Sequence, residues 1–328
     1  MNLPSKNEIQ NIRSLTSIIT SYWNSQSLYA AVDLGLFDYI KNEITFDDLV
    51  KQLDLNRKTV VMLLKILTKY ELITHSNQNL KLTKKGELLT SDHPFSMVPA
   101  TYVFCTNHYL AWLNVTDALI TSQEVFSKTH TQKFFPWLLS NEVAKNYYYN
   151  ALNLYALIDY LPIMPSLELG STIIDIGCGK MGLLQLLKYH YPDKKYLGYD
   201  LPELKNYEQT GIEFHGGDFF KDQIPNADTI ILSRILHDWD DSDSSIILQN
   251  CIRALNPKGN IIIIEAPISE NLDHNWGATL DINMRVMIGG SERNTLEFNE
   301  LFVNNGLNLK DTKLIKESNL IIYNLEIK

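Results

Sequence analysis

Five apolar runs of strand type recur in the C-terminal half of the chain, and helical segments separate most of them. The runs occupy residues 171–177, 195–201, 211–215, 228–233 and 260–266. Because near-continuous apolar strands leave no side for solvent, they indicate a parallel sheet that is covered on both faces. Two further runs, 310–315 and 320–327, are separated by a short turn, which is typical of an antiparallel pair at a sheet edge. The pattern predicts an α/β fold with a seven-stranded sheet.

The N-terminal part of the chain has a helical pattern instead. Apolar positions over 7–22 fall on one face of a helix, and a second short helix is expected over 28–40. Residues 45–90 follow the order helix, turn, helix, hairpin, which predicts a winged helix. Such a unit serves either DNA binding or dimerisation. The net charge of −9 favours dimerisation, and a winged-helix regulator stays open as an alternative.

Residues 95–165 are predicted to be helical and are rich in aromatic side chains. Most of these rings suit ordinary core packing, but a helical layer of this kind also suits a pocket for a flat ligand. We therefore expect three segments. They are a winged-helix dimerisation domain at 1–95, a helical substrate-binding layer at 96–165 and the sheet domain at 166–328.

Cysteine usage and hydropathy narrow the setting of the protein. Three cysteines lie far apart without C-x-x-C spacing, which favours reduced thiols, a cytoplasmic protein and no zinc site. The first residues have no apolar signal sequence, and no apolar run reaches the ~20 residues of a membrane helix. The acidic charge counts against nucleic acid, because phosphate binding needs a cationic surface. We expect neither a membrane nor a nucleic acid as a partner.

A glycine-rich turn, G-C-G-K-M-G at 177–182, follows the first predicted strand. With Asp200 at the end of the next strand, it fits a dinucleotide site in which Asp200 binds a ribose diol. Asp175 lies two residues before Gly177, where a carboxylate can hold an ammonium group but repels a pyrophosphate. This charge counts against NAD, although an NAD-dependent enzyme stays open as an alternative.

The fourth strand ends in a polar cluster, H-D-W-D-D at 237–241. Open α/β sheets present their chemistry at the carboxyl ends of strands. Histidine titrates near neutral pH, and a carboxylate on its second nitrogen fixes the tautomer and stabilises the imidazolium. The pattern predicts His237 as a general base, with Glu265 and Glu292 facing it.

The order of these motifs resembles the S-adenosylmethionine-dependent O-methyltransferases of the plant caffeate and bacterial polyketide type. The motifs are D-I-G-C-G, Y-D-L-P, G-D-F-F at 217–220, H-D-W-D-D, Glu265 and G-G-S-E-R at 289–293. The resemblance covers nearly the whole chain. It implies a homodimeric class I methyltransferase with a Rossmann-like sheet, which uses S-adenosyl-L-methionine and releases S-adenosyl-L-homocysteine. Methylation of nitrogen or carbon, or a rearrangement without methyl transfer, stays open as an alternative.

The resemblance also implies roles for individual residues. In catalysis, Glu265 and Glu292 flank the base His237. The cofactor-binding residues are Asp175, Gly177, Gly179, Asp200, Leu201, Asp218, Phe219 and Arg234. The residues for a hydroxylated aromatic or polyketide-like substrate are Tyr149, Asn153, Asp238, Trp239, Asn283, Met284 and Met287. No metal is required, because most of the remaining rate comes from holding the reacting atoms in line.

The sequence departs from the family pattern at a few positions. Met181 stands where the family has glycine, so a shifted or tighter turn is expected there. Asn153 replaces a methionine of the substrate helix, and Arg285 replaces an apolar residue. These differences concern the identity of the substrate more than the type of reaction.

Overall fold

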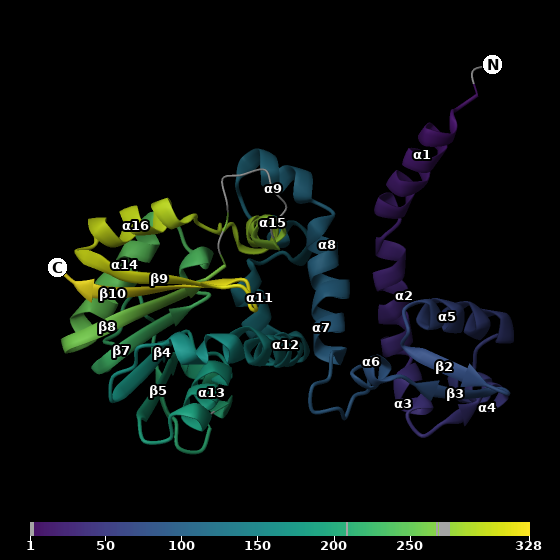
Figure 1. The fold of residues 1–328 in the computed structure, drawn as a ribbon, viewed down its shortest axis with the longest axis horizontal. Helices are drawn as coiled ribbons and strands as arrows, with labels where there is room; N and C mark the ends of the chain where they lie inside the picture. Colours follow the sequence, from purple (N-terminus) through teal and green to yellow (C-terminus); the bar gives the residue numbers. More distant parts are fainter. Residues whose placement is uncertain (1–2, 208, 267, 269–275) are drawn as a thin grey trace. The chain divides into compact units, whose positions relative to one another are not determined.

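The computed structural model describes the chain except for residues 1–2, 208, 267 and 269–275. The chain packs into two compact units, Met1–Asn107 and His108–Lys328, which are taken separately here (Figure 1). The sequence instead suggests segments that end at 95 and 165. Residues 96–107 of the expected helical layer lie in the first unit. Ile163 and Met164 pack in the same core as the strands of the sheet, so the rest of the layer belongs to the second unit.

The first unit has the helix, helix, hairpin order of the predicted winged helix. Its elements are α1 (Lys6–Ile19), α2 (Tyr22–Asp33), α3 (Leu36–Ile40), β1 (Ile44–Thr45), α4 (Phe46–Leu53), α5 (Arg57–Lys69), β2 (Ile73–Ser76), β3 (Asn79–Leu82), α6 (Lys84–Glu87), α7 (Val98–Tyr102) and the π-helix η1 (Val103–Asn107). The side chains of Thr45 and Asn56 cap α4 and α5, since each accepts a backbone N–H of its helix. The predicted helix at 28–40 is wrong in one respect. Gly35, with φ 65°, separates α2 from α3.

The second unit begins with a helical layer. Its elements are α8 (His108–Trp112), α9 (Val115–Thr121), α10 (Phe126–His130), α11 (Phe134–Ser140), α12 (Glu142–Tyr160) and the 3₁₀ helix η2 (Leu161–Ser166). Many of its aromatic rings pack edge to face, as Phe126 and Phe134 do with centroids 5.2 Å apart. Val286 and Met287 of α15 (Trp276–Ile288) complete this core. Much of the aromatic content therefore serves ordinary packing.

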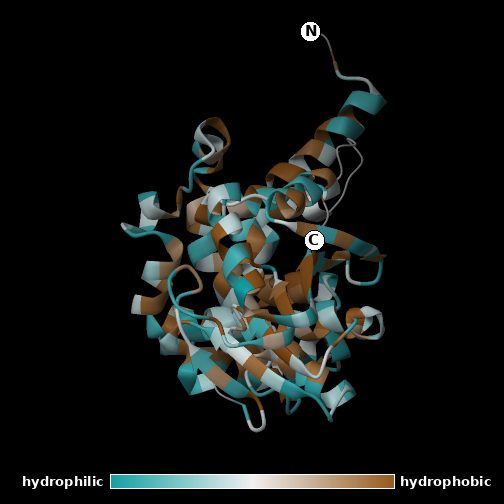
Figure 2. Ribbon diagram, turned by 90° about the vertical axis from the view of Figure 1, so that its left-hand side faces the viewer, coloured by the Kyte–Doolittle hydropathy of each residue, from teal (hydrophilic) through white to brown (hydrophobic). Residues whose placement is uncertain are grey.

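The second unit then forms the predicted seven-stranded sheet, in the order β6-β5-β4-β7-β8-β10-β9. The strands are β4 (Thr172–Ile176), β5 (Lys195–Asp200), β6 (Glu213–Gly216), β7 (Ala227–Ser233), β8 (Leu255–Glu265), β9 (Leu307–Ile315) and β10 (Leu320–Ile327). The first five are parallel to one another, and β10 runs antiparallel between β8 and β9. The antiparallel edge pair is confirmed. In Figure 2 the strands of the sheet are largely brown, the colour of hydrophobic residues.

Helices cover both faces of the sheet, as the apolar strands predict. Successive strand residues point to opposite faces, so Ile173 and Ile174 enter different core clusters. One cluster joins the strands to α14 (Asp241–Ala254) and α16 (Thr295–Asn304), and the other joins them to α13 (Gly182–His190) (Figure 1). Two 3₁₀ segments, η3 (Pro202–Tyr207) and η4 (Leu236–Asp238), follow strand ends. Within the described residues, no helix has both the length and the apolar character needed to cross a membrane.

Candidate active site

The strand order reverses between β4 and β7, and ligands of open α/β sheets bind in the crevice at such a point. Gly177 follows β4 with φ 76°, and Arg234 follows β7 with φ 58°. A Cβ on Gly177 would lie 2.3 Å from Cδ1 of Ile235, so both the backbone angle and the space favour glycine. The predicted glycine turn and the predicted polar cluster therefore meet at one edge of the sheet.

Asp200 is held by the glycine turn. The N–H of Gly179 donates to Oδ2 at 2.8 Å, and the N–H of Leu201 donates to Oδ1 at 2.7 Å. Burial nevertheless raises the pKa of Asp200 to about 6. Each carboxylate oxygen keeps a lone pair beyond these two bonds. The position and orientation of Asp200 therefore suit acceptance of hydrogen bonds from a vicinal diol, as in a ribose.

Two further carboxyl groups, one buried and one half-buried, suit a cationic ligand. Burial, with the charge of Asp200, raises the pKa of Asp175 well above its usual value. Burial also raises the pKa of Asp159, on α12, to about 6. A cation bound near such groups favours their charged forms, because an opposite charge offsets the cost of desolvation. These carboxyl groups fit S-adenosylmethionine, which carries an ammonium, a sulfonium and a ribose diol.

Met181 takes the left-handed backbone of a glycine, with φ 62°, and its side chain is fully buried. Gly182 then begins α13, where an added Cβ would lie 2.7 Å from Oδ1 of Asn153 and 3.0 Å from Cβ of Ala156. The departure from the family pattern is thus met by an uncommon backbone angle at Met181. The glycine one position later gives α12 room to approach the turn.

Asp218 and Phe219 lie after β6, where the resemblance implies the adenine. Oδ1 of Asp218 accepts the N–H of Phe220 at 2.9 Å, and Oδ2 pairs with Nζ of Lys221 at 2.7 Å. The rings of Phe219, Phe220 and Trp239 pack edge to face, with Phe219 and Trp239 centroids 5.9 Å apart. Trp239, predicted to contact substrate, is therefore packed against the segment predicted to contact the cofactor.

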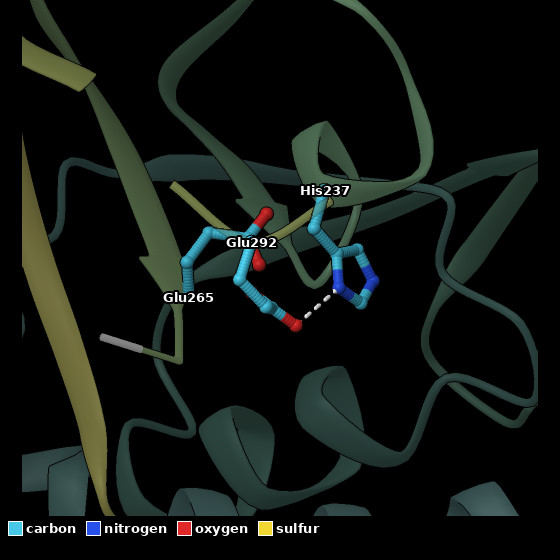
Figure 3. A group of neighbouring side chains, drawn as sticks. All are labelled: His237, Glu265 and Glu292. Atoms are coloured by element: carbon cyan, nitrogen blue, oxygen red, sulfur yellow. Dashed lines mark hydrogen bonds and ion pairs between the residues drawn. The ribbon is translucent and has the colours of Figure 1, made fainter. Parts of the chain in front are cut away.

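The ring of His237 lies between the carboxylates of Glu292 and Asp238. Nδ1 is 2.9 Å from Oε1 of Glu292, as Figure 3 shows, and Nε2 is 3.1 Å from Oδ1 of Asp238. The His237 side chain is 7% exposed, and that of Glu292 is fully buried. Glu265 lies beside them and its Oε1 accepts the N–H of Leu236 at 3.0 Å. The structure therefore brings together the three residues predicted for catalysis.

Arg234 completes this cluster. Its guanidinium contacts Oε1 of Glu292 at 2.7 Å and Oε2 of Glu265 at 3.2 Å. Ligand atoms of His237, Glu265 and Glu292 lie within 4.8 Å of one another, a spacing that would also suit a metal ion. However, the guanidinium already supplies the cation that the two glutamates need. The cluster that includes Arg234 therefore does not fit a metal ion, because the guanidinium lies against both glutamates.

The charges of the cluster shift the pKa values of its members. Burial and Arg234 lower the pKa of His237, but Asp238, Glu265 and Glu292 outweigh them and raise it to about 9. Burial raises the pKa of Glu292, but Arg234 and His237 outweigh it and lower the value to about 2. Burial raises the pKa of Asp238 and of Glu265. The unliganded site therefore favours a charged His237 paired with a charged Glu292.

The loop at 289–293 fixes the turn that carries His237, and this function was not predicted from the sequence. The N–H of Ser291 donates to the His237 carbonyl at 2.9 Å, and a Cβ on Gly290 would lie 2.3 Å from that oxygen. The guanidinium of Arg293 donates to the carbonyls of Leu236 and Trp239, each at 2.7 Å. The sequence did contain a signal for this role: Arg293 directly follows Glu292, so the loop that brings Glu292 to the His237 ring also brings Arg293 to the turn.

The residues predicted to bind substrate do not all lie together. Oδ1 of Asn283 accepts from Nε1 of Trp112 at 2.9 Å, and Met287 is buried in the aromatic core. Asn153 lies against the start of α13, and its Oδ1 has no hydrogen-bond partner among the described residues. The ring of Tyr149 would lie 3.7 Å from a Cβ on Gly179. Tyr149 and Asn153 therefore lie near the glycine turn, and Tyr149 also packs against the aromatic core that contains Met287. Met284 lies on α15 with Asn283 and Met287.

Comparison with known proteins gives the class. Residues 112–308 match the O-methyltransferase domain, and residues 16–92 match the O-methyltransferase dimerisation domain. The chain belongs to the S-adenosylmethionine-dependent O-methyltransferase family. The predicted class of enzyme, cofactor and fold are thereby confirmed, which counts against the NAD enzyme and the winged-helix regulator.

Individual relatives align over most of the chain. The phenazine O-methyltransferase of Lysobacter antibioticus is 29% identical over 90% of this chain and 91% of its own. The acetylserotonin O-methyltransferase of Gallus gallus is 27% identical over 87% and 90%. Among solved structures, that of LaPhzM has a TM-score of 0.89 at 27% identity and covers 99% of this chain and 100% of its own. Human N-acetylserotonin methyltransferase in complex with SAM shares the fold, with a TM-score of 0.89 at 23% identity, and covers 99% of each chain.

Proposed function

We propose that the protein methylates a hydroxyl group of a small aromatic or polyketide-like molecule, with His237 as the general base. The observation that carries this proposal is the contact between Nδ1 of His237 and Oε1 of Glu292, 2.9 Å apart, at the switch point of the sheet. A carboxylate on Nδ1 leaves Nε2 as the nitrogen that can take a proton from a substrate.

In the same proposal, the cofactor is held by the glycine turn and by the carboxyl ends of β4 and β5. When bound, S-adenosylmethionine supplies a methyl group on a positively charged sulfur. In our proposal Asp200 accepts hydrogen bonds from the ribose hydroxyls, and Asp175 lies toward the ammonium group. Gly177 and Gly179 let the backbone approach the ligand, since both have positive φ angles, 76° and 51°.

In the proposed reaction the proton of the substrate hydroxyl passes to Nε2 of His237, while the oxygen gains the methyl group. A neutral hydroxyl is a poor nucleophile, so its loss of a proton to a nearby base speeds the step. Glu292 accepts a hydrogen bond from the N–H of Nδ1 and stabilises the imidazolium that forms. Asp238 lies 3.1 Å from Nε2, the nitrogen that takes the proton in this proposal. A cationic ligand acts with Arg234 to favour the neutral imidazole before the reaction.

The relatives indicate which substrates to test first. By their names, they act on a phenazine and on acetylserotonin, which are aromatic molecules. We expect one hydroxylated aromatic in a panel to gain one methyl group, with S-adenosylhomocysteine released in equal amount, as measured by mass spectrometry. NMR of the product locates the methyl group. A methyl group on nitrogen or carbon, or a product without added mass, would contradict the proposal.

We also propose that a second copy of the chain covers helix α1. No residue of α1 is buried, although the helix has an apolar face. Its side chains Ile12, Leu15, Ile18 and Ile19 are 56–71% exposed. Figure 2 shows hydrophobic residues alternating with hydrophilic ones along this helix beside the N label. A helix with an uncovered apolar face needs a partner, and the match to a dimerisation domain indicates a second copy.

The dimer predicts a clear effect of charge on α1. Ile18→Glu is expected to shift the mass in light scattering from dimer toward monomer, because a carboxylate would be buried in the interface. Leu296→Glu, on α16, is the matched control, since Ile18 and Leu296 are both 67% exposed. The control should leave the mass unchanged. A wild-type protein that is monomeric at micromolar concentration would refute the proposal.

A further inference from the structure

Arg234 has a backbone that its surroundings must hold in place. It follows β7 directly, and its φ of 58° lies in the left-handed region, which is uncommon for a residue with a side chain. Its N–H donates to the carbonyl of Ile264 on β8 at 2.9 Å, which anchors it across the sheet. Such angles concentrate at functional sites, where the structure over-determines them. The turn aims the side chain of Arg234 at the cluster around His237.

The guanidinium of Arg234 connects three acidic or basic groups. One terminal nitrogen lies 2.7 Å from Oε1 of Glu292 and 2.9 Å from Nδ1 of His237. The other lies 3.2 Å from Oε2 of Glu265 and 3.3 Å from Oε2 of Glu292. An arginine binds two carboxylates in this way because its donors form a rigid planar fork. Arg234 therefore fixes both glutamates relative to the imidazole.

The contacts at Nδ1 exclude one another. A guanidinium only donates, so it can bond Nδ1 only when that nitrogen carries a lone pair. Glu292 only accepts when ionised, so it can bond Nδ1 only when that nitrogen carries the proton. Oε1 of Glu292 lies 2.9 Å from Nδ1, and Arg234 holds the same oxygen at 2.7 Å. When Glu292 accepts a hydrogen bond from the N–H of Nδ1, the lone pair of the neutral ring is on Nε2.

The charge of Arg234 opposes that of the carboxylates around His237. Among the described residues, the ionisable groups that face this cluster come from β7, η4, β8, the 289–293 loop and α12. They are Arg234, Asp238, Glu265, Glu292, Tyr148, Asp159 and Tyr160. Asp281 and Arg293 bind the backbone of the cluster, at the N–H of Glu292 and at the carbonyls of Leu236 and Trp239. Arg234 is the cation that contacts the His237 ring and both glutamates. Without it, the surrounding carboxylates would hold the proton on His237 more strongly.

We propose that Arg234 is a positioning residue: it holds Glu292 on Nδ1 of His237 and offsets the carboxylate charge, so that Nε2 becomes free to accept a proton at working pH. The resemblance implies instead that Arg234 serves the cofactor. The inference rests on the proposed function of His237 as the base. It adds to that function the group that makes the histidine usable as a base.

The test measures the pH midpoint of His237 in two ways, from the NMR signals of its ring and from the pH dependence of the rate. Two measurements are made on Arg234→Met: NMR of the His237 ring in the unliganded protein, and kcat/KM against pH. We expect both midpoints to move upward by about one to three pH units, because one positive charge beside the imidazole is lost. We expect Arg234→Lys to keep the midpoint and lose part of the rate, because lysine lacks the fork that holds both glutamates.

Two further variants provide controls. Arg234→Met/Glu265→Gln removes one charge of each sign, so its midpoint should return toward that of the wild type, and it should also fold if Arg234→Met does not. Arg253→Met removes an exposed arginine of α14 and should change neither midpoint. S-adenosylhomocysteine binding is measured by calorimetry for each variant.

The outcomes separate this inference from the proposed function. An unchanged His237 midpoint in Arg234→Met would refute the role of Arg234, whatever happens to the rate. Loss of S-adenosylhomocysteine affinity by more than about tenfold with unchanged midpoints would assign Arg234 to the cofactor instead. A wild-type rate in His237→Gln would refute the base, but the NMR midpoint would still report whether Arg234 offsets the carboxylate charge.

Discussion

His237→Gln is expected to lower kcat about 10²–10⁴-fold on a substrate whose hydroxyl is not ionised at the assay pH, since a positioned base contributes that much. Glutamine has nearly the same size and can still bond Glu292, but it cannot take up a proton. The loss should shrink to less than about tenfold on an acidic phenol that is already ionised, because that substrate needs no base. Both rates are measured by release of S-adenosylhomocysteine.

His190→Gln is the matched control for this substitution. His190 ends α13, where its Nδ1 contacts the carbonyl of Leu186 at 3.0 Å, and it lies outside the cluster. Its substitution should leave both rates unchanged. An equal loss of rate on ionised and un-ionised phenols in His237→Gln would show that His237 orients the substrate without acting as a base.

The direction of the pH dependence follows from the raised pKa of His237. The base must be neutral, and the unliganded protein holds the pKa at about 9. The value of kcat/KM should therefore rise with pH until the ring is neutral, with a midpoint well above the ordinary 6.5. A profile that is flat between pH 7 and 9 would contradict a proton on His237 in the free protein.

The second large effect is expected from Glu292→Ala, which should lower the free energy of unfolding by about 3–5 kcal/mol. The substitution removes the buried partner that Arg234 contacts at 2.7 Å and His237 at 2.9 Å, so each cationic group loses the nearer of its two carboxylate partners. Glu292→Gln keeps the shape and should lose less stability. Its removal of a negative charge should move the kcat/KM midpoint to lower pH, opposite to the shift expected for Arg234→Met.

The loss of stability in Glu292→Ala depends on pH. The pKa of Glu292 is lowered to about 2, so its contribution is present above its ordinary 4.5 and is lost as pH falls through about 2. The pKa of His237 is raised to about 9, so its contribution is present below 6.5 and is lost as pH rises through about 9. Denaturant unfolding should show the largest difference from the wild type between about pH 4.5 and 6.5. A constant difference from pH 3 to pH 10 would contradict the coupling.

The sequence was sufficient to predict the sheet, its antiparallel edge and the position of the glycine turn. The reason is local: buried parallel strands are apolar throughout, and a residue that follows such a strand lies at the same edge as its neighbours. His237 follows β7, Glu265 ends β8, and Glu292 lies in the short motif G-G-S-E-R. Their proximity in the fold could therefore be predicted. The helix boundary at Gly35 was missed because the apolar period continues across the break.

The supporting contacts could not be predicted, because they join segments far apart in the chain. Arg293 holds the carbonyls on both sides of His237, which depends on where the 289–293 loop crosses the η4 turn. The need for glycine at position 290 arises from the same crossing, because a Cβ there would overlap the His237 carbonyl. The contact of Asn153 with the start of α13 likewise depends on the packing of α12. Motifs therefore indicate which residues react, whereas the fold decides which residues hold them.

The account is tested most directly by methyl transfer from methyl-labelled S-adenosylmethionine to an un-ionised hydroxylated aromatic, comparing the wild type with His237→Gln. We expect the label on the substrate oxygen with the wild-type protein, and a rate at least about 10²-fold lower with the variant. A label on nitrogen or carbon would contradict the proposed acceptor. Equal rates for the two proteins would contradict the role of His237.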